Sequence, residues 1–328
     1  MTTFSVVPSS PVSAELENYT LDNGTLGSNN SSWCYATDVE LAVISTFICV
    51  PCVFGLLGNG AVIWLLGFCM KRTPVTTYIL NLAVADFAVL LLIIPIVLLP
   101  LFESYCLPLP FIRVFITALP LFHLMFSVSQ FLLTIISVDR CVSVLFPIWY
   151  RFHRPEKLST ILCALVWIFC FLVHGICYNF VFLEGNFKLL YLIFVNALVC
   201  LPVVTICSLI LVIKFCFKTQ QRQRKKLLMA ILLALFFFLF LAFPLNAIHL
   251  QVLSSDDFSF VQIYSLGAGY LCASLNSFIN PLIYFLVGQK KRCLGGENWK
   301  LIFQRVFKQE ENVHGQELQL SVQIQVSV

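Results

Sequence analysis

Ser137-Val138-Asp139-Arg140-Cys141, running on to Phe146-Pro147-Ile148-Trp149-Tyr150, is the stretch that decides the fold of this chain. An acid and an arginine lie side by side at the end of a long apolar run, Phe111 to Val138, and a basic, proline-containing segment follows at 151–157. Charges are costly in hydrocarbon and are kept there only when they are paired or used. The pattern predicts a helix that ends at a membrane surface. Its two charges either extend to water without further role or form a functional site.

The composition is that of a membrane protein. Of the 328 residues, 59% are hydrophobic and 11% are charged, and the mean hydropathy is +0.92. A soluble domain carries about 25% charged residues. Most of the 14 cysteines lie inside apolar runs, where they behave as small hydrophobes rather than as a disulfide framework.

Seven apolar segments are each long enough to cross about 30 Å of hydrocarbon. They predict an all-α membrane protein, a bundle of seven transmembrane helices over residues 39–287. Prolines lie inside most of these segments, which membrane helices tolerate because neighbouring groups satisfy the freed carbonyls. The predicted spans are Val39–Cys69, Thr76–Phe102, Phe111–Leu145, Leu158–Leu183, Phe187–Phe217, Leu227–Leu253 and Phe258–Val287.

The charges between the spans predict the orientation of the chain. Basic residues follow the first, third, fifth and seventh spans, whereas acidic residues dominate the opposite side. By the positive-inside rule, the N-terminus is extracellular and the C-terminus cytoplasmic, in a multi-pass protein of the plasma membrane. Residues 1–38 contain acceptor triplets for N-glycosylation and are predicted to form a glycosylated extracellular tail. The acceptor residues are Asn18, Asn23, Asn29 and Asn30.

The C-terminal residues divide into two predicted segments. In residues 288–308, apolar side chains alternate with basic ones, as in an amphipathic helix on an anionic membrane surface. Cys293 follows three basic residues and is a candidate palmitoylation site, although an unmodified thiol fits the pattern equally well. Residues 309–328 form a cytoplasmic tail that ends in strict apolar–polar alternation. Disorder is the favoured prediction for this tail, and strand addition to a PDZ-type partner is the alternative.

A carboxylate at the middle of the second span, Asp86, is a functional-site hypothesis by default. Polar side chains from the first, third and seventh spans are expected at a similar depth. Together they predict a small hydrated site for a proton or a hard cation such as Na⁺. The alternative is a hydrogen-bond cluster that only joins helices. The site residues are Asp86, Ser129, Asn276, Ser277 and Asn280, with Asn59 nearby.

Two prolines predict hinges in the last two spans. Asn280-Pro281-Leu282-Ile283-Tyr284 interrupts the backbone ladder of the seventh span near its inner end. Pro244 lies within the sixth span, after the aromatic run Phe236 to Phe243. A helix kinked at this point can pivot its inner half, while most of the phenylalanines are expected to face lipid.

These landmarks resemble, in order and one per helix, those of the rhodopsin-like G protein-coupled receptors, and residues 141–155 and 284–288 resemble the Mas-related receptors. The resemblance implies that an extracellular ligand, a peptide or a small molecule, activates a heterotrimeric G protein through outward movement of the sixth helix. Arg140 would then face the G protein, with Asp139 holding it at rest, and the cluster around Asp86 would be an allosteric sodium site. The landmarks are Gly58-Asn59, Leu82-Ala83-Val84-Ala85-Asp86, Asp139-Arg140-Cys141, Trp167, Pro202, Pro244 and Asn280-Pro281-x-x-Tyr284.

The chain departs from the rhodopsin-like pattern at several positions. Phe115 replaces the cysteine at the top of the third span, so the usual disulfide is not expected. Ala242 replaces the tryptophan before the span-six proline, and Ile210 replaces the span-five tyrosine. Residues 222–226 are basic where an acid would hold Arg140 inactive. We therefore expect elevated basal signalling.

The ligand contacts are predicted from the resemblance and from the polarity of the outer half. Some Mas-related receptors bind cationic ligands through an acidic pair, but the aligned positions here are Cys177 and Lys188. A mostly apolar pocket with few polar groups suits a neutral, hydrophobic or partly anionic ligand, with Lys188 as the anion contact. Each histidine has the alternative of being a satisfied interior residue. The candidate contacts are His123, Cys177, Lys188, Asn246 and His249.

Other function classes fit the sequence less well. An opsin-like photoreceptor needs a lysine in the last span, and residues 258–287 contain none. A transporter or ion-conducting protein would use Asp86 as its ion site, but the two halves of the chain show no internal repeat. Enzyme motifs such as H-E-x-x-H, G-x-S-x-G and the P-loop are absent. We predict a receptor and not an enzyme, with no cofactor other than Na⁺ and no nucleic-acid partner.

Overall fold

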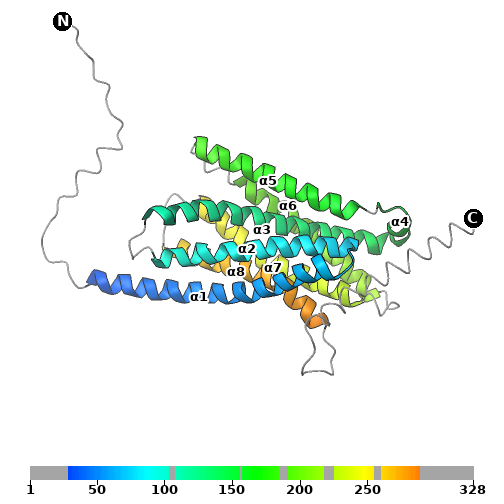
Figure 1. Cartoon of the computed structure of the whole chain (residues 1–328), viewed down its shortest axis with the longest axis horizontal. Coiled ribbons are helices and arrows are strands. Elements are labelled where there is room, and N and C mark those ends of the chain that lie inside the picture. Colours follow the sequence, from blue (N-terminus) through cyan, green and yellow to red (C-terminus); the bar gives the residue numbers. More distant parts are fainter. Residues whose placement is uncertain are drawn as a thin grey trace, which may run out of the picture. The chain divides into compact units, whose positions relative to one another are not determined.

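Long helices make up most of the described chain. The computed structural model describes residues 29–102, 108–155, 157–184, 191–217, 225–254 and 260–288, and no strand occurs in these ranges (Figure 1). A π-helical turn, η2 (Leu65–Cys69), extends the first helix, and a short helix, α4 (Pro147–Phe152), follows the third. The long helices are α1 (Asn29–Trp64), α2 (Pro74–Phe102), α3 (Pro108–Leu145), α5 (Leu158–Glu184), α6 (Tyr191–Phe217), α7 (Lys225–Ser254) and α8 (Phe260–Gly288).

Each predicted span coincides with one long helix, apart from differences at the ends. The chain divides into two compact units, Met1–Leu41 and Ala42–Val328. Helix α1 begins at Asn29, inside the segment predicted as a tail, because helical structure does not stop where the apolar run stops. Residues 187–190 and 258–259, at the starts of the fifth and seventh predicted spans, lie outside the described residues.

Length and apolarity alone identify five membrane-crossing candidates among the described residues. A shorter apolar helix, Val199–Lys214, lies within α6. Exposed apolar side chains lie on the surfaces of these helices, for example Leu57 (69% exposed) and Phe240 (64% exposed), as expected for helices that face lipid. The five ranges are Val39–Cys69, Pro74–Leu99, Thr117–Leu145, Leu158–Asn179 and Met229–Ile248.

Local sequence explains where α2 begins. The Thr73 hydroxyl accepts a hydrogen bond from the backbone N–H of Thr76 at 3.2 Å, and the Thr76 hydroxyl accepts one from the backbone N–H of Thr73 at 2.7 Å. This reciprocal pair satisfies two N–H groups that would otherwise be unpaired at the helix start. Pro74 has no N–H to satisfy, and its fixed φ suits the first helical position.

A proline also separates α3 from α4. Pro147 disfavours helical geometry at the preceding residue, and Phe146 accordingly has φ −122° and ψ 63°. The chain turns there and begins the short helix α4, with Pro147 in its first turn. As a result, the residues after α3 remain at the end of the bundle instead of extending away from it.

Helix α3 is the central element of Ala42–Val328. It packs against α2, α5, α6 and α7 and also contacts α4, and α8 packs against α2 and α7. Fully buried side chains such as Phe122, Leu132 and Phe238 fill the interior. Helix α1 approaches α8 closely, because a Cβ added to Gly58 would lie 2.9 Å from the Pro281 ring. A larger residue at position 58 would push the two helices apart.

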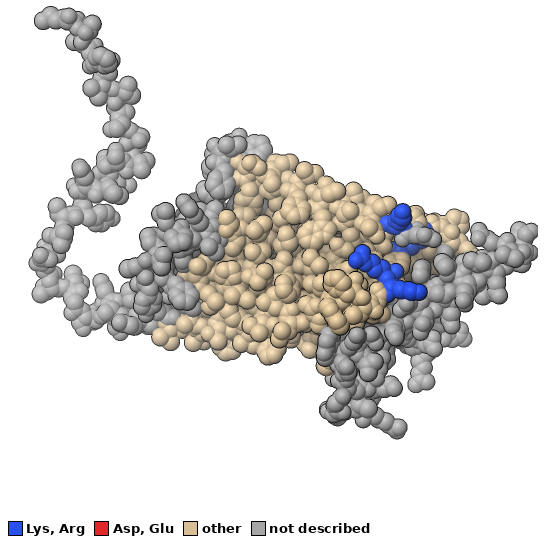
Figure 2. Space-filling view, viewed as in Figure 1, with Lys and Arg blue, Asp and Glu red and all other residues tan. Residues whose placement is uncertain are grey.

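The charged side chains of the visible face lie at one end of the bundle. Figure 2 shows Lys and Arg gathered near the end that carries α4, and the rest of the described surface on that face shows neither basic nor acidic side chains. Four exposed basic residues lie in or beside the helix connections at this end: Lys71, Arg72, Lys157 and Lys214. We call this end of the bundle the basic end.

Candidate functional site

Asp139 is the centre of a charged cluster at the basic end. Its carboxylate accepts a hydrogen bond from Arg140 Nε at 3.2 Å and forms an ion pair with the same guanidinium. It accepts a second charged contact from Arg154 at 2.8 Å and a hydrogen bond from the Tyr150 hydroxyl at 3.0 Å. Asp139 is only 8% exposed, so these contacts act where water screens them weakly. We call Asp139, Arg140, Tyr150 and Arg154 the Asp139 cluster.

The two arginines of this cluster lie against the ring of Tyr150. The guanidinium carbons of Arg154 and Arg140 are 4.6 and 5.9 Å from the ring centroid, and Arg140 also donates to the Tyr150 hydroxyl at 2.9 Å. Cation–π contacts of this kind contribute about 0.5–2 kcal/mol. Burial raises the pKa of the Tyr150 phenol above its ordinary value, so the hydroxyl keeps its proton and can donate to Asp139.

Helix α4 and the segment after it position two members of the cluster. Tyr150 lies in α4, where its backbone N–H bonds to the carbonyl of Phe146 at 2.9 Å. Arg154 follows the end of α4, and it also donates to the Tyr78 hydroxyl of α2 at 3.4 Å. The cluster therefore joins the C-terminal part of α3 to α2 and to the connection between α3 and α5.

Sequence reasoning gave no role to Tyr150 or Arg154, although both belong to the segment that decides the fold. A usable signal was present, because Pro147 ends α3 and turns the following residues back toward Asp139. The sequence pattern does not give the path of the chain between α3 and α5. That path determines which basic residue of 151–157 reaches the Asp139 carboxylate.

A second polar cluster surrounds Asp86 in the middle of the bundle. Asp86 is fully buried and accepts hydrogen bonds from Ser129 at 2.8 Å, from Ser277 at 3.0 Å and from Asn280 at 2.7 Å. The donors come from α3 and α8, so Asp86 of α2 joins three helices. The side chain of Asn59 adds α1, since it donates to the carbonyl of Ser277 at 3.0 Å. We call these residues the Asp86 cluster.

The Asp86 cluster suits a small hard cation chemically. One carboxylate and the hydroxyl oxygens of Ser129 and Ser277 form the kind of all-oxygen donor set that such ions prefer. Asn276 directly precedes Ser277 on α8 and is also buried. Its amide nitrogen has no hydrogen-bond partner within the described part of the chain. The structure therefore brings four of the five predicted site residues into direct contact and leaves Asn276 outside that network.

The predicted hinge residues lie inside helices that run without a break past each proline, although each proline lacks the N–H that would bond to the preceding turn. Pro244 lies within α7, and Pro281 and Tyr284 lie within α8, where both are buried. The aromatic run of α7 faces two environments: Phe238 is fully buried, whereas Phe240 is 64% exposed. Most of these rings were expected to face lipid; among the described ones, Phe236 (53%) and Phe240 are exposed, whereas Phe238 is not.

The candidate ligand contacts do not form a described site. Asn246 donates to the carbonyl of its own helix at Ala242, at 2.7 Å, and His123 Nδ1 lies 2.9 Å from the carbonyl of Leu119. Each of these bonds is to a carbonyl one turn earlier in the residue's own helix. Cys177 is buried, at 2% exposure. Lys188 and the side chain of His249 lie outside what the structure describes, so their role stays a prediction.

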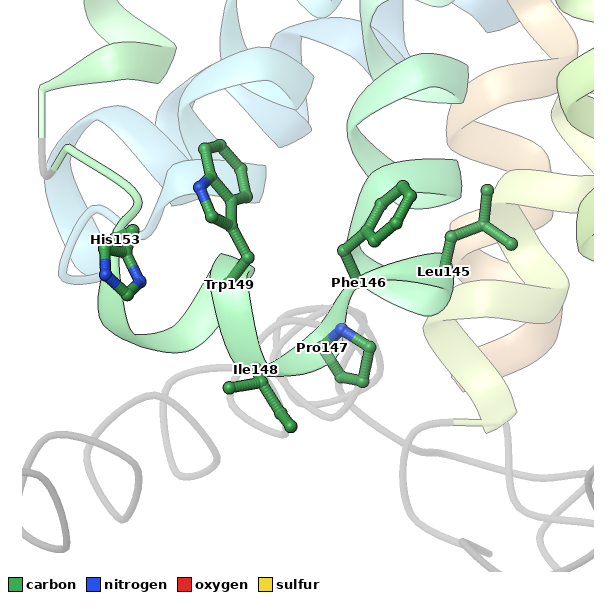
Figure 3. Close-up of a pocket in the computed structure, with 6 residues that line it drawn as sticks. All are labelled: Leu145, Phe146, Pro147, Ile148, Trp149 and His153. Atoms are coloured by element: carbon green, nitrogen blue, oxygen red, sulfur yellow. The ribbon is translucent and has the colours of Figure 1, made fainter.

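A hollow of the surface lies at the basic end. It has a volume of about 400 Å³ and is lined by the last residue of α3 and by α4 with its flanking residues (Figure 3). Ile148 and Phe146 are 74% and 60% exposed there. The lining residues are Leu145, Phe146, Pro147, Ile148, Trp149 and His153.

Several predicted sites fall outside the described residues and stay predictions. These are the acceptors Asn18 and Asn23, the lipidation candidate Cys293, the surface helix from residue 289 to 308 and the tail 309–328 with its PDZ-type motif. Asn29 and Asn30 form the start of α1, and nothing in the described structure tests their glycosylation.

Comparison with known proteins identifies the family. Residues 58–284 match the family "7 transmembrane receptor (rhodopsin family)", a range that runs from α1 into α8. The chain is 36% identical to Mas-related G-protein coupled receptor member H of Rattus norvegicus, over 88% of this chain and 90% of that protein. It is 35% identical to member D of Macaca fascicularis, over 84% and 88% of the two chains. It is also 33% identical to Proto-oncogene Mas of Rattus norvegicus, over 80% and 83%.

These matches confirm the predicted class and fold. The members of this family are receptors of the plasma membrane rather than enzymes. Their fold is a seven-helix bundle, and its helices correspond to α1, α2, α3, α5, α6, α7 and α8. Because the match covers more than half of the chain, the likeness is not limited to a few landmarks. The chain belongs to the rhodopsin family of seven-transmembrane receptors and, within it, to the Mas-related G protein-coupled receptors.

Proposed function

We propose that an extracellular ligand shifts this receptor to a state in which Arg140 leaves Asp139 and contacts a heterotrimeric G protein. The observation that carries the proposal is the Asp139 cluster itself, in which Arg140 is held by a buried carboxylate at the inner end of α3. A guanidinium restrained in this way has an alternative position only when its partners move. Outward movement of the inner half of α7, below Pro244, opens the space that Arg140 needs.

The G protein is proposed to dock on the basic end. The hollow beside α4 offers exposed apolar side chains, and Lys71, Arg72, Lys157 and Lys214 surround the inner end with positive charge. By the positive-inside rule this end faces the cytoplasm. Protease access or antibody labelling of a C-terminal tag in intact and permeabilised cells tests the orientation, which fails if the tag is reached in intact cells.

Nucleotide exchange on purified G protein tests the central proposal. Membranes that contain the receptor should accelerate GTPγS binding to Gα, and Arg140→Ala should remove most of this acceleration at equal surface expression. An unchanged exchange rate in Arg140→Ala would refute the role of Arg140. Ion flux without any G protein would instead favour the transporter class.

For the ligand, we propose a neutral, apolar or partly anionic molecule that contacts Lys188. In support, Cys177 is buried, and the outer polar groups His123 and Asn246 already bond to their own helices, which leaves few groups to recognise a cation. A ligand-library screen with a promiscuous Gα tests this. Anionic ligands should lose potency in Lys188→Glu, and unchanged potency would end the Lys188 assignment.

We also propose that the Asp86 cluster binds Na⁺ and thereby favours the resting state. The support is its oxygen-rich donor set around one buried carboxylate. Replacing NaCl by choline chloride should raise basal exchange in the wild type, and this ion effect should be absent in Asp86→Asn.

A further inference from the structure

Two arginines bind the Asp139 carboxylate, and each uses a different oxygen. Arg140 donates from Nε to Oδ2 at 3.2 Å, and its Nη2 binds the same oxygen. Arg154 instead donates from Nη2 to Oδ1 at 2.8 Å. The Tyr150 hydroxyl also donates to Oδ2, at 3.0 Å. When Arg140 leaves, each carboxylate oxygen therefore keeps one donor, Arg154 on Oδ1 and Tyr150 on Oδ2.

The contacts that hold Arg154 do not involve Arg140. Its Nη2 donates to the Tyr78 hydroxyl of α2 at 3.4 Å, and its guanidinium carbon lies 4.6 Å from the centre of the Tyr150 ring. The Arg154 side chain is 7% exposed, and its Nε is a buried donor with no hydrogen-bond partner among the residues that the structure describes. Nε and Nη2 share one edge of a guanidinium, and such an edge can bind both oxygens of a carboxylate. Arg154 can therefore pair with both Asp139 oxygens once Arg140 has left.

Charge compensation decides whether Asp139 needs a proton when Arg140 leaves. A buried carboxylate without a cation takes up a proton, because its charged form is costly away from water. A protonated Asp139 would also hold Arg140 only weakly and would release it without a ligand. With Arg154 in place, the carboxylate has a cation partner whether Arg140 is bound or has left.

We propose that Arg154 is a positioning residue for the Arg140 switch. By staying paired with Asp139, it lets Arg140 leave without proton uptake at Asp139 and keeps the resting restraint insensitive to pH. This role rests on the proposed function, since it concerns how Arg140 is held and released. Without Arg154, acidification should neutralise Asp139 and release Arg140.

The other charged and titratable groups at this end of the bundle do not replace Arg154. Phenols and thiols are ordinarily neutral below about pH 8, whereas a histidine ordinarily titrates near pH 6.5, so the exposed His153 needs a control. Lys157, before α5, and Lys214, in α6, are exposed to water, and the side chains of Lys225 and Lys226 in α7 lie outside what the structure describes. The phenols and thiols are Tyr78 of α2, Tyr150 of α4, Cys141 of α3, Cys163 of α5 and Cys207 of α6.

The pH profile of ligand-free GTPγS binding tests this role. From about pH 7.5 to about pH 5.5, basal exchange above the Arg140→Ala baseline should change less than about twofold in the wild type and rise at least about fivefold in Arg154→Gln. Arg154→Lys keeps the cation and should restore the flat profile. Lys157→Gln removes an exposed cation three residues further on and should also keep the flat profile. Each receptor is also measured with His153→Gln, which removes the exposed histidine.

A purely structural role of Arg154 predicts a different profile. Loss of packing alone would raise exchange by the same factor at every pH, and such a parallel shift in Arg154→Gln would overturn the proposal. A wild-type receptor whose basal exchange rises as steeply with acidification as that of Arg154→Gln would overturn it as well.

Infrared spectroscopy of the detergent-solubilised, full-length receptor detects the proton directly and needs no G protein. The difference between each receptor and its Asp139→Asn counterpart isolates the Asp139 carboxyl band. On acidification this band should appear in Arg154→Gln and not in the wild type. If Arg154→Gln does not fold, Tyr78→Phe, which removes the hydroxyl that Arg154 contacts on α2, should show a weaker band.

The two measurements separate this proposal from the proposed function. An Asp139 band that is equal in the wild type and the variants, or absent from all of them, would overturn the role of Arg154. Exchange that is unchanged in Arg140→Ala would refute the proposed function, and the infrared difference would still decide whether Arg154 keeps the proton off Asp139.

Discussion

Replacing Asp139 by Asn is the most direct perturbation of the proposed resting state. The substitution keeps the shape of the side chain and one acceptor oxygen but removes the negative charge. In the structure that charge is shared by Arg140, Arg154 and the Tyr150 hydroxyl, and it is nearly excluded from water. All three contacts weaken together, and Arg140 becomes available to a G protein without a ligand.

The magnitude follows from these contacts. Hydrogen bonds to charged groups contribute about 1.5–3 kcal/mol each, and breaking a buried ion pair by removing one partner costs about 3–5 kcal/mol. Arg140 is 13% exposed and regains some hydration, so we expect a net loss near the lower bound, about 3 kcal/mol. At about 1.4 kcal/mol per factor of ten, a loss of about 3 kcal/mol from the resting state raises the ratio of active to resting receptor more than 100-fold. A receptor that is about 1% active at rest would become about half active.

Ligand-free GTPγS binding is the assay for this prediction. Basal exchange should rise strongly in Asp139→Asn, less in Arg154→Gln, and least in Tyr150→Phe. The Tyr150→Phe variant loses about 1 kcal/mol of hydrogen bonding but keeps the ring that faces both guanidiniums. Arg140→Ala sets the baseline, and surface labelling corrects for expression. If the Asp139→Asn receptor reaches the surface and its basal exchange equals that of the wild type, the cluster is not a restraint and the reasoning is wrong.

Three further predictions concern stability, each measured as the unfolding temperature of the detergent-solubilised receptor. Na⁺ at about ten times its dissociation constant should stabilise the wild type by about 1.4 kcal/mol, and Asp86→Asn should show no difference between NaCl and choline chloride. Gly58→Ala should lower stability by about 1–3 kcal/mol, because the new Cβ lies 2.9 Å from Pro281, whereas Gly175→Ala meets nothing within 4 Å and should be neutral or stabilising. Trp167→Phe should cost about 1 kcal/mol, since its Nε1 donates to Asn81 at 3.0 Å; no change would mean that this bond is not maintained.

The long helices were predictable because the length of an apolar run is a direct physical signal. A run that exceeds the thickness of the hydrocarbon has few structures other than a helix, and each predicted span coincides with one. Helix α4 gives no such signal, since six residues are too short for a periodic pattern. The start of α1 at Asn29 was missed for a related reason: apolarity marks where a membrane is crossed, not where a helix begins.

The partners of Asp86 could be predicted more completely than those of Asp139, because fewer polar residues lie within reach of Asp86. An acid in the middle of an apolar span has few polar groups within reach, so Ser129, Ser277 and Asn280 could be named in advance for Asp86. Near the surface, several basic residues were possible partners for Asp139. The path of the chain between α3 and α5 determines that Arg154 forms the ion pair.

Helix α3 carries the charge of one cluster and a donor to the other, and this limits how the receptor can switch. Ser129 of α3 donates to Asp86 of α2, and Asp139, near the C-terminal end of α3, is joined to α2 through Arg154 and Tyr78. Both ties join α3 to α2, so a movement that breaks only the inner one leaves this helix pair joined at mid-depth. In the proposed switch, α7 and the part of α8 after Pro281 would move, since Pro244 and Pro281 remove backbone hydrogen bonds there. We therefore expect the proposed switch to expose Arg140 by movement around a fixed α2–α3 pair, without dismantling the core of the bundle.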